Sequence, residues 1–233
     1  ELVFNQNGMT KYPIIIHHGI LPVSSLNRFA RYLRQSGINA YASQVSSANS
    51  FAFRAGELTM QIDKVLRESG AEKVNIIAHS MGGLDSRLAI SSLGYHDRVA
   101  SLSTISSPHH GSCFANFFVD YNIWPLKVLL TIIGAALIPG NSLDTFDLRL
   151  ANFDLSVKNV TEKFNPANPN HSDVYYQSWA GVSGPGSENA IALPLYLSWY
   201  FINKCGGAND GIVEVESAKW GDFRGTIQAD HLR

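Results

Sequence analysis

Charged residues are scarce in this sequence. Asp, Glu, Lys and Arg make up 16% of its 233 residues, well below the share of roughly a quarter that soluble domains carry. The deficit indicates a large buried fraction or much apolar surface, on a chain long enough for one domain with a sizeable core. The net charge is only −1 at pH 7, and no cluster of Lys or Arg is present. We therefore expect no nucleic-acid partner, because no positive field would attract phosphates.

Cysteine is also scarce, with Cys113 and Cys205 as the only two. They could form one disulfide or be two buried thiols, and two cysteines in a chain of this length do not decide the compartment. The sequence starts at Glu1 and shows neither an initiator Met nor a signal peptide, so we expect a processed form. Asn159 and Asn170 begin sequons that would accept N-glycans in a secretory pathway, and we expect a secreted glycoprotein.

Internal repeats and low-complexity tracts are absent, and the first half of the chain alternates short apolar runs with segments of helical spacing. Strands are predicted at residues 12–17, 38–45, 74–78, 99–105 and 174–180, with shorter ones at 213–215 and 223–227. Helices are predicted at residues 25–35, 58–66 and 81–93, the second of them stopping at Gly70. This alternation predicts an α/β fold with a mostly parallel sheet and helices on both faces, in a single domain of residues 1–233.

The alternation breaks between residues 113 and 170, where no clear strand is present. This segment contains an apolar run, Val128 to Ile138, that is too short to cross a membrane and is closed by Pro139. The run fits either a permanently buried core helix or an apolar cap over a pocket.

The stretch "IIAHSMGGL", residues 76–84, places a serine between an apolar run and two glycines. A sharp turn from a strand into a helix would project the Ser80 hydroxyl, as a nucleophile requires. Only small residues fit two positions to either side of such a turn, and Ala78 and Gly82 occupy those places. The alternative is a polar residue in an ordinary turn. The pattern favours Ser80 as the nucleophile of a hydrolase.

A serine nucleophile needs an acid and a histidine base, which follow it in that order on sheets of this kind. Three histidines precede Ser80, and three follow it too early, namely His17, His18, His79, His96, His109 and His110. A seventh, His171, would have to draw its acid from within residues 113–170. His231 remains as the base, and the best acid before it is Asp210 in the turn "CGGANDG". The rivals Asp222 and Asp230 are too close to His231 in sequence. Alone, "NDG" is typical of a solvated turn, so both assignments depend on Ser80.

An acyl-transfer site also needs two backbone N–H donors for an oxyanion. Met81 begins the helix after Ser80, and its backbone N–H points toward the place where an oxyanion would form. Gly19 lets the backbone turn sharply past the nucleophile, which leaves the N–H of Ile20 as the second donor. We expect His18 to be a structural histidine beneath this loop.

The stretches "YPIIIHHGI", "IIAHSMGGLDSR", "STISSPHHGS" and "ANDGIV", with a late "DH", resemble the true triacylglycerol lipases of the α/β-hydrolase superfamily. The similarity is nearest to lipases of the Pseudomonas and Burkholderia type and their fungal relatives, and it is weakest between residues 113 and 170. The resemblance implies an α/β-hydrolase fold and a mobile lid at residues 113–170. It also implies that Ser80 is the nucleophile, that His231 is its base and then acid, and that Asp210 orients His231. The backbone N–H groups of Ile20 and Met81 would bind the oxyanion.

Two features depart from the lipase pattern. Bacterial relatives carry a calcium-binding aspartate two residues after the catalytic histidine, and Arg233 stands at that place here. The chain also ends at Arg233, where relatives continue into a helix. A tight calcium site needs six or more oxygen ligands, and the nearby candidates are Asp222, Asp230 and Glu188. We therefore expect no metal, and we expect no cofactor.

The sequence thus predicts a serine lipase that hydrolyses carboxylic esters of lipids, such as acylglycerols, through an acyl-enzyme. Its partner would be a lipid–water interface, at a membrane or a droplet, contacted through the lid. Another acyl-group serine hydrolase, namely a phospholipase, a cutinase-like esterase or an acyltransferase, would use the same triad. A non-catalytic lipid-binding module on this fold would keep the apolar cap, but the intact triad argues against it.

Overall fold

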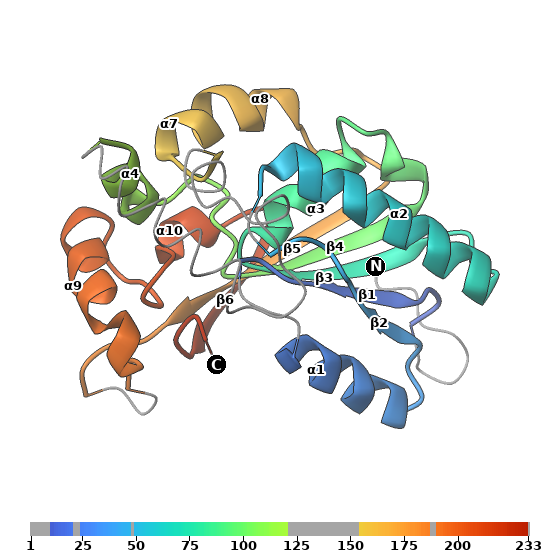
Figure 1. Cartoon of the computed structure of the whole chain (residues 1–233), viewed down its shortest axis with the longest axis horizontal. Coiled ribbons are helices and arrows are strands. Elements are labelled where there is room, and N and C mark those ends of the chain that lie inside the picture. The colour runs from blue at the N-terminus through green and yellow to red at the C-terminus, as the bar shows by residue number, and fades with distance from the viewer. Residues whose placement is uncertain (1–9, 21–23, 48, 121–153, 187–189, 233) are drawn as a thin grey trace.

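The computed structural model describes residues 10–20, 24–47, 49–120, 154–186 and 190–232. Six strands form one sheet in the order β2-β1-β3-β4-β5-β6, and every neighbouring pair is parallel (Figure 1). The strands are β1 (Ile14–His17), β2 (Ala40–Ala42), β3 (Val74–His79), β4 (Val99–Ile105), β5 (Tyr175–Val182) and β6 (Asp222–Gln228). The predicted α/β fold with a parallel sheet is confirmed.

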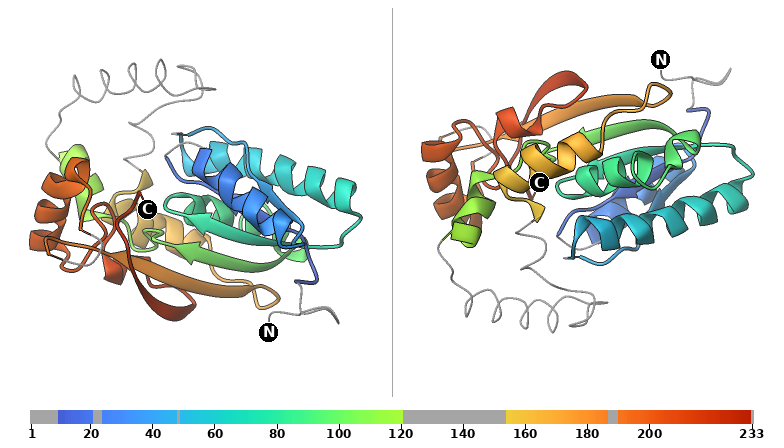
Figure 2. Two further views of the ribbon diagram at one scale, coloured as in Figure 1. Left: turned by 90° about the horizontal axis from the view of Figure 1, so that it is seen from below. Right: turned by 90° about the horizontal axis from the view of Figure 1, so that it is seen from above.

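Helices cover both faces of this sheet. They are α1 (Ser24–Gln35), α2 (Phe51–Ser69), α3 (Gly82–Ile90), α4 (Cys113–Asp120), α7 (Val157–Asn159), α8 (Asn165–Ala167), α9 (Tyr196–Cys205) and α10 (Val215–Ala218), with the short turns η1 (Tyr95–Asp97), η2 (Val160–Phe164) and η3 (Leu193–Leu195). Helix α1 lies on one face, and α2 and α3 lie on the other (Figure 2). Ile14 and Ile16 of β1 pack with Ala30 of α1, whereas Ile15 packs on the side of α2, because successive strand residues point to opposite faces.

Helix α2 begins and ends where its sequence dictates. The Oγ of Ser50 accepts a hydrogen bond from the N–H of Phe53 at 3.2 Å and caps the first turn. Gly70 ends the helix in the left-handed conformation, with a φ of 67°, and donates its N–H to the carbonyl of Leu66. The prediction that Gly70 stops this helix is confirmed.

The strand predicted at residues 213–215 is not formed. The N–H groups of Ile212 and Val213 donate to the side chain of Asp210 at 3.0 and 2.9 Å, so they close a tight loop instead of pairing with a strand. Val215 already belongs to helix α10. The prediction is wrong because a local side chain satisfies the backbone groups that a sheet would have used.

Helix α9 is not apparent from the apolar pattern of the sequence. Leu193 and Leu197, in η3 and α9, are 87% and 82% exposed, and Tyr200 is 55% exposed. These apolar side chains face solvent rather than the core, so their helical spacing marks no buried stripe. No helix of the described residues is long and apolar enough to cross a membrane.

A disulfide joins Cys113, at the start of α4, to Cys205, at the end of α9, with the two Cα atoms 6.4 Å apart. The two cysteines are therefore bonded rather than free thiols. The lid predicted at residues 113–170 and its apolar run, Val128 to Ile138, fall largely on residues 121–153, which lie outside the described residues. The lid and the alternative core helix stay predictions.

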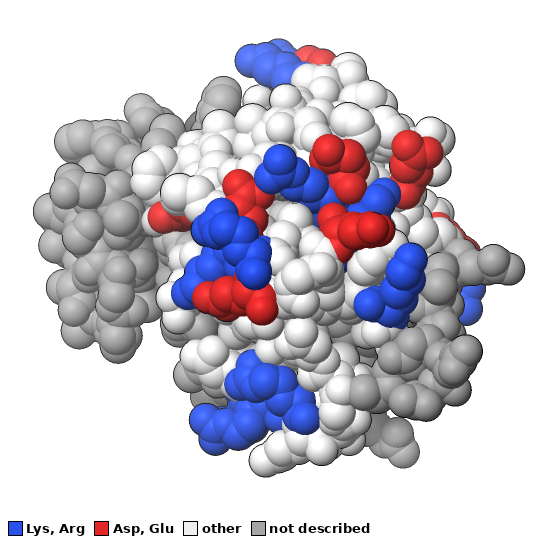
Figure 3. Space-filling model, turned by 90° about the vertical axis from the view of Figure 1, so that its right-hand side faces the viewer, with Lys and Arg blue, Asp and Glu red and all other residues white. Residues whose placement is uncertain are grey.

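Charged side chains are prominent on the side of the molecule toward the amino ends of the strands. Acidic and basic residues lie interspersed there, and neither sign dominates (Figure 3). Exposed ion pairs of the described residues include Lys64–Glu68 and Arg98–Asp63. Helix α9 lies at the opposite side (Figure 1) and contains a single charged residue, Lys204.

Candidate active site

Ser80 lies in a sharp turn between β3 and α3, at the carboxyl edge of the sheet. Its φ is +57°, a conformation that costs an L-residue roughly 1–2 kcal/mol. Its N–H donates to the carbonyl of Ile105 in β4 at 3.0 Å. A Cβ at Gly82 would lie 2.7 Å from the carbonyl oxygen of His18, so the turn tolerates no side chain there. The predicted strand-to-helix turn at Ser80 is confirmed.

His231 and Asp210 lie beside Ser80, in the arrangement predicted from chain order. Ser80 Oγ is 2.9 Å from Nε2 of His231, and Nδ1 of His231 is 2.7 Å from Oδ2 of Asp210. Because a carboxylate only accepts hydrogen bonds, Nδ1–H donates to Asp210, and Nε2 is left to accept the Ser80 hydroxyl. His231 is 6% exposed and Asp210 is fully buried, so water competes little for either hydrogen bond.

The Asp210 carboxylate stays ionised although it is buried. Burial raises the pKa of Asp210. The neighbouring His231 outweighs burial through its charge and its hydrogen bond, together with hydrogen bonds from the Val213 backbone and the Ser106 hydroxyl, so the pKa lies below its ordinary value. An ionised Asp210 can stabilise a positive charge on His231.

His79 contacts His231 but not as a second base. Their ring centroids lie 4.6 Å apart. Burial, and then the charge that His231 can carry, lower the pKa of His79 to about 3. His79 is therefore a neutral ring near pH 7, and it packs against His231 without repelling a proton there.

The loop after β1 passes directly over Ser80. A Cβ at Gly19 would lie 2.6 Å from the Cβ of Ser80, 2.9 Å from its Oγ and 3.0 Å from the backbone nitrogen of Met81. Glycine is needed here for close approach. Ile20 packs against the apolar cluster that contains Met81. Within the described part of the chain, neither the N–H of Ile20 nor that of Met81 donates a hydrogen bond, so both are available to a ligand.

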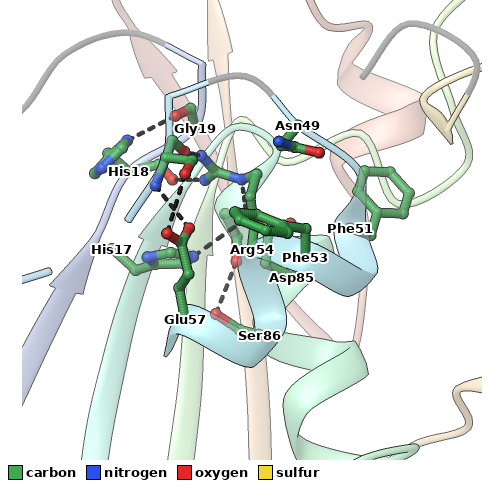
Figure 4. Close-up of polar contacts among 12 residues, drawn as sticks. His17, His18, Gly19, Asn49, Phe51, Phe53, Arg54, Glu57, Asp85 and Ser86 are labelled. Carbon is green, nitrogen blue, oxygen red and sulfur yellow. Dashed lines mark hydrogen bonds and ion pairs between the residues drawn. The ribbon is translucent and has the colours of Figure 1, made fainter. Parts of the chain in front are cut away.

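A buried ion pair that the sequence motifs do not reveal lies beneath this loop (Figure 4). Arg54 of α2 and Asp85 of α3 are fully buried, and Nε of Arg54 donates to Oδ2 of Asp85 at 2.7 Å. The same guanidinium donates to the carbonyl of His18 at 2.5 Å and to those of Ser46 and Ser47. One side chain thus joins the loop after β1 to two helices.

The paired histidines of β1 complete this cluster. Nε2 of His17 lies 3.2 Å from Oδ2 of Asp85. Burial outweighs the effect of Asp85 and lowers the pKa of His17, so a neutral ring donates this hydrogen bond. Burial, and then the charge of Arg54, lower the pKa of His18 to about 3. The ring of His18 donates from Nδ1 to the carbonyl of Gly19 at 2.7 Å, which fits the structural role expected for it.

The sequence did contain a signal for Arg54. This residue falls on the buried stripe of α2, together with Phe51, Ala55 and Leu58. A charged side chain on an apolar stripe is tolerated only when it is paired, so Arg54 itself indicates a buried partner. No comparable signal identifies Asp85, because it lies 31 residues away on another helix.

The two sequons lie in different surroundings. Asn159 is part of α7, and its Nδ2 donates to the carbonyl of Asp154 at 3.1 Å. Asn170 is exposed, and its Oδ1 accepts a hydrogen bond from Nε1 of Trp220 at 2.8 Å. Attachment of a glycan at either position stays a prediction.

The described residues contain one group of His, Cys, Asp or Glu side chains close enough to share a metal ion, namely Cys113, Cys205 and Glu214. Its two sulfur atoms are bonded to each other. Of the acids considered for calcium, Asp222 is exposed and Asp230 is buried, while Glu188 lies outside the described residues. The expectation of no metal and no cofactor stays a prediction.

The chain has relatives among known proteins. Residues 13–143 match the family model described as palmitoyl protein thioesterase. Triacylglycerol lipase 2 of Saccharomyces cerevisiae is 30% identical over 210 residues, which make up 87% of this chain and 59% of that protein. The triacylglycerol lipase of Pseudarthrobacter phenanthrenivorans is 36% identical over 124 residues, 48% of this chain and 37% of that protein. The chain therefore spans less than two thirds of the length of these two relatives.

A solved structure extends the comparison to the fold. The mature form of the Bacillus licheniformis lipase BlEst2 matches with a TM-score of 0.72 and 25% identity, over 95% of this chain and 85% of that one. The resemblance to lipases of the α/β-hydrolase superfamily, inferred above from sequence motifs, is confirmed by these relatives.

Replacing Arg54 by Met would leave Asp85 as an uncompensated buried charge. We expect the free energy of unfolding, measured by urea denaturation, to fall by about 3–5 kcal/mol. The matched control is Arg98→Met, because the side chain of Arg98 is 46% exposed where it pairs with Asp63, and surface pairs contribute about 1 kcal/mol or less. Equal losses in the two variants would contradict the structural role given to Arg54.

Proposed function

We propose that this chain, which belongs to the palmitoyl protein thioesterase family of the α/β-hydrolase superfamily, hydrolyses carboxylic esters of lipids with Ser80 as its nucleophile. The observation that carries the proposal is the continuous hydrogen-bonded run from Ser80 Oγ through the imidazole of His231 to the carboxylate of Asp210. Such a run activates a serine for acyl transfer. The relatives named triacylglycerol lipase support a lipid ester as the substrate.

In the first half-reaction, Ser80 Oγ attacks the carbonyl carbon of the ester while Nε2 of His231 takes the hydroxyl proton. The electron pair of the C=O bond moves to oxygen, and the N–H groups of Ile20 and Met81 hold the resulting oxyanion. The tetrahedral intermediate then expels the alcohol, which leaves with the proton that Nε2 returns. The acyl group stays bonded to Ser80.

In the second half-reaction, water attacks the acyl carbon and gives its proton to Nε2 of His231. The second tetrahedral intermediate collapses, Ser80 Oγ recovers the proton, and the carboxylic acid leaves. Asp210 takes up no proton in either step. It accepts the hydrogen bond of Nδ1–H, which keeps Nε2 free as the base, and it stabilises the imidazolium that forms.

The surface near this site suits a substrate presented at a lipid–water interface. Leu193 and Leu197 are mostly exposed. Their segment lies beside His231, because the N–H of Ala192 donates to the carboxylate of Asp230 at 2.8 Å. Apolar surface that enters lipid contributes roughly 25 cal/mol per Å² to binding. Peripheral contact with a membrane or droplet, and secretion of the protein to reach it, are parts of this proposal.

The family model favours a second candidate, hydrolysis of an acyl thioester. Ser80 and His231 would attack a thioester carbonyl in the same way, but a thiolate needs less help from a proton to leave because thiols are stronger acids than alcohols. Palmitoyl glycerol and palmitoyl-coenzyme A carry the same acyl group and separate the two candidates. We expect the higher kcat/KM for the glycerol ester. A preference of about tenfold or more for the thioester would identify a thioesterase instead.

A fluorophosphonate probe should label Ser80, because an activated serine attacks phosphorus as it attacks a carbonyl carbon. Ser80→Ala should take up no label and lose ester hydrolysis by roughly 10⁴-fold or more. The matched control is Ser107→Ala, since the buried Oγ of Ser107 has no hydrogen-bond partner among the described residues. Equal labelling of wild type and Ser80→Ala would reject Ser80 as the nucleophile. Absence of label from both proteins would favour a non-catalytic lipid-binding module.

A lid within residues 113–170 would make the rate depend on the interface. In water the closed form would cover Ser80, and burial of apolar surface in lipid would favour the open form. We therefore expect the rate against a sparingly soluble ester to jump once its concentration passes the solubility limit and droplets appear. Smooth saturation below that limit, with no jump beyond it, would contradict the lid and favour a permanently buried core helix.

A further inference from the structure

Ser106 shares an unusual backbone conformation with Ser80. These two serines, with φ values of 50° and 57°, are the only non-glycine residues with a positive φ in the described part of the chain. A non-glycine residue holds such a conformation only where its surroundings impose it, and such outliers gather at functional sites. Ser106 follows the last residue of β4, Ile105, whose carbonyl accepts the N–H of Ser80. It therefore lies one strand away from the proposed nucleophile.

The hydroxyl of Ser106 has a defined direction. The side chain is buried, with 3% of the residue exposed, and its Oγ accepts the N–H of Gly181 in β5 at 2.9 Å. That hydrogen bond leaves the hydroxyl proton for another acceptor. Hydrogen bonding with Ser106 is also among the causes that lower the pKa of Asp210. A Cβ at Gly181 would lie 3.0 Å from Ser106 Oγ and 2.9 Å from the Cβ of Asp210. Glycine at position 181 therefore lets β5 approach both Ser106 and Asp210 closely.

The other donors to Asp210 come from its own end of the chain. Oδ1 accepts the N–H groups of Ile212 and Val213, which belong to the same tight loop, and Oδ2 accepts Nδ1–H of His231. Ser106, by contrast, lies at the end of β4, so a hydrogen bond from its hydroxyl would hold Asp210 to the central strands of the sheet. Without it, the loop would hold the carboxylate by local contacts only.

The geometry points to Ser106 as a positioning residue that donates its hydroxyl proton to Asp210 and so holds the carboxylate toward His231, an inference that rests on the proposed function. Ser106 touches neither the substrate nor the reacting atoms, and it acts through Asp210 and His231 alone.

Ser106→Gly tests this role, because glycine adopts a positive φ without strain and removes the whole CH2OH side chain, including the acceptor of the Gly181 N–H. We expect kcat for a soluble ester to fall roughly tenfold with KM unchanged, the size of one lost hydrogen bond to an ion. The melting temperature should fall as well, because the buried N–H of Gly181 loses its acceptor, so both proteins are compared at a temperature where each is folded. The control is Ser107→Ala, the neighbouring buried serine with an unpartnered Oγ, which should keep the wild-type kcat.

The acid limb of kcat/KM against pH gives a second readout. Asp210 without this donor takes up a proton more readily, and it attracts the proton on His231 more strongly, so the limb should move to higher pH. The other titratable groups whose charges act on Asp210 or respond to it are His79 and Glu214, and the variant leaves both in place.

Three outcomes would count against a proposal, and they are distinguishable. An unchanged kcat and pH profile in Ser106→Gly would overturn the inference and leave the proposed function standing. A joint fall of kcat and melting temperature with an unmoved acid limb would reduce Ser106 to a structural residue. Failure of the fluorophosphonate to label the wild-type protein would overturn the proposed function itself.

Discussion

The left-handed backbone at Ser80 is the constraint on which the rest of the site depends. A strand that turns so sharply brings the start of α3 against the loops beside it, and the space for side chains disappears at Gly19, Gly82 and Gly83. The same turn lifts Ser80 Oγ to the edge of the sheet, where it meets His231 after β6. The glycines around Ser80 are therefore consequences of one backbone angle rather than separate features.

A buried cation keeps the neighbouring loop at this short distance. Arg54 donates to the carbonyl of His18, one residue before Gly19, and is paired with Asp85 behind it. Hydrogen bonds to an ion are strong where water is excluded, so the loop has little freedom to move away from Ser80. Stability and site geometry consequently depend on the same side chain in α2.

Much of this site follows from chain order, because a parallel sheet brings the carboxyl ends of its strands to one edge. That rule made Asp210 and His231 predictable, although each is ambiguous alone. The sheet and helices of the first half were equally predictable, since their apolar residues face the core. Helix α9 was not, because its apolar residues face solvent, and the pairing of Arg54 with Asp85 was not, because it joins two helices distant in sequence. The role proposed for Ser106 was not predictable either, since only its φ distinguishes it from other serines.

The disulfide has a topological consequence for the three residues of the proposed triad. Ser80 precedes Cys113 in the chain, whereas Asp210 and His231 follow Cys205. The covalent ring closed by the disulfide includes residues 113–205, and the triad lies on the two arms outside it. A protease that cuts the ring once therefore releases no fragment. The arm with the nucleophile and the arm with its acid and base stay covalently joined through sulfur.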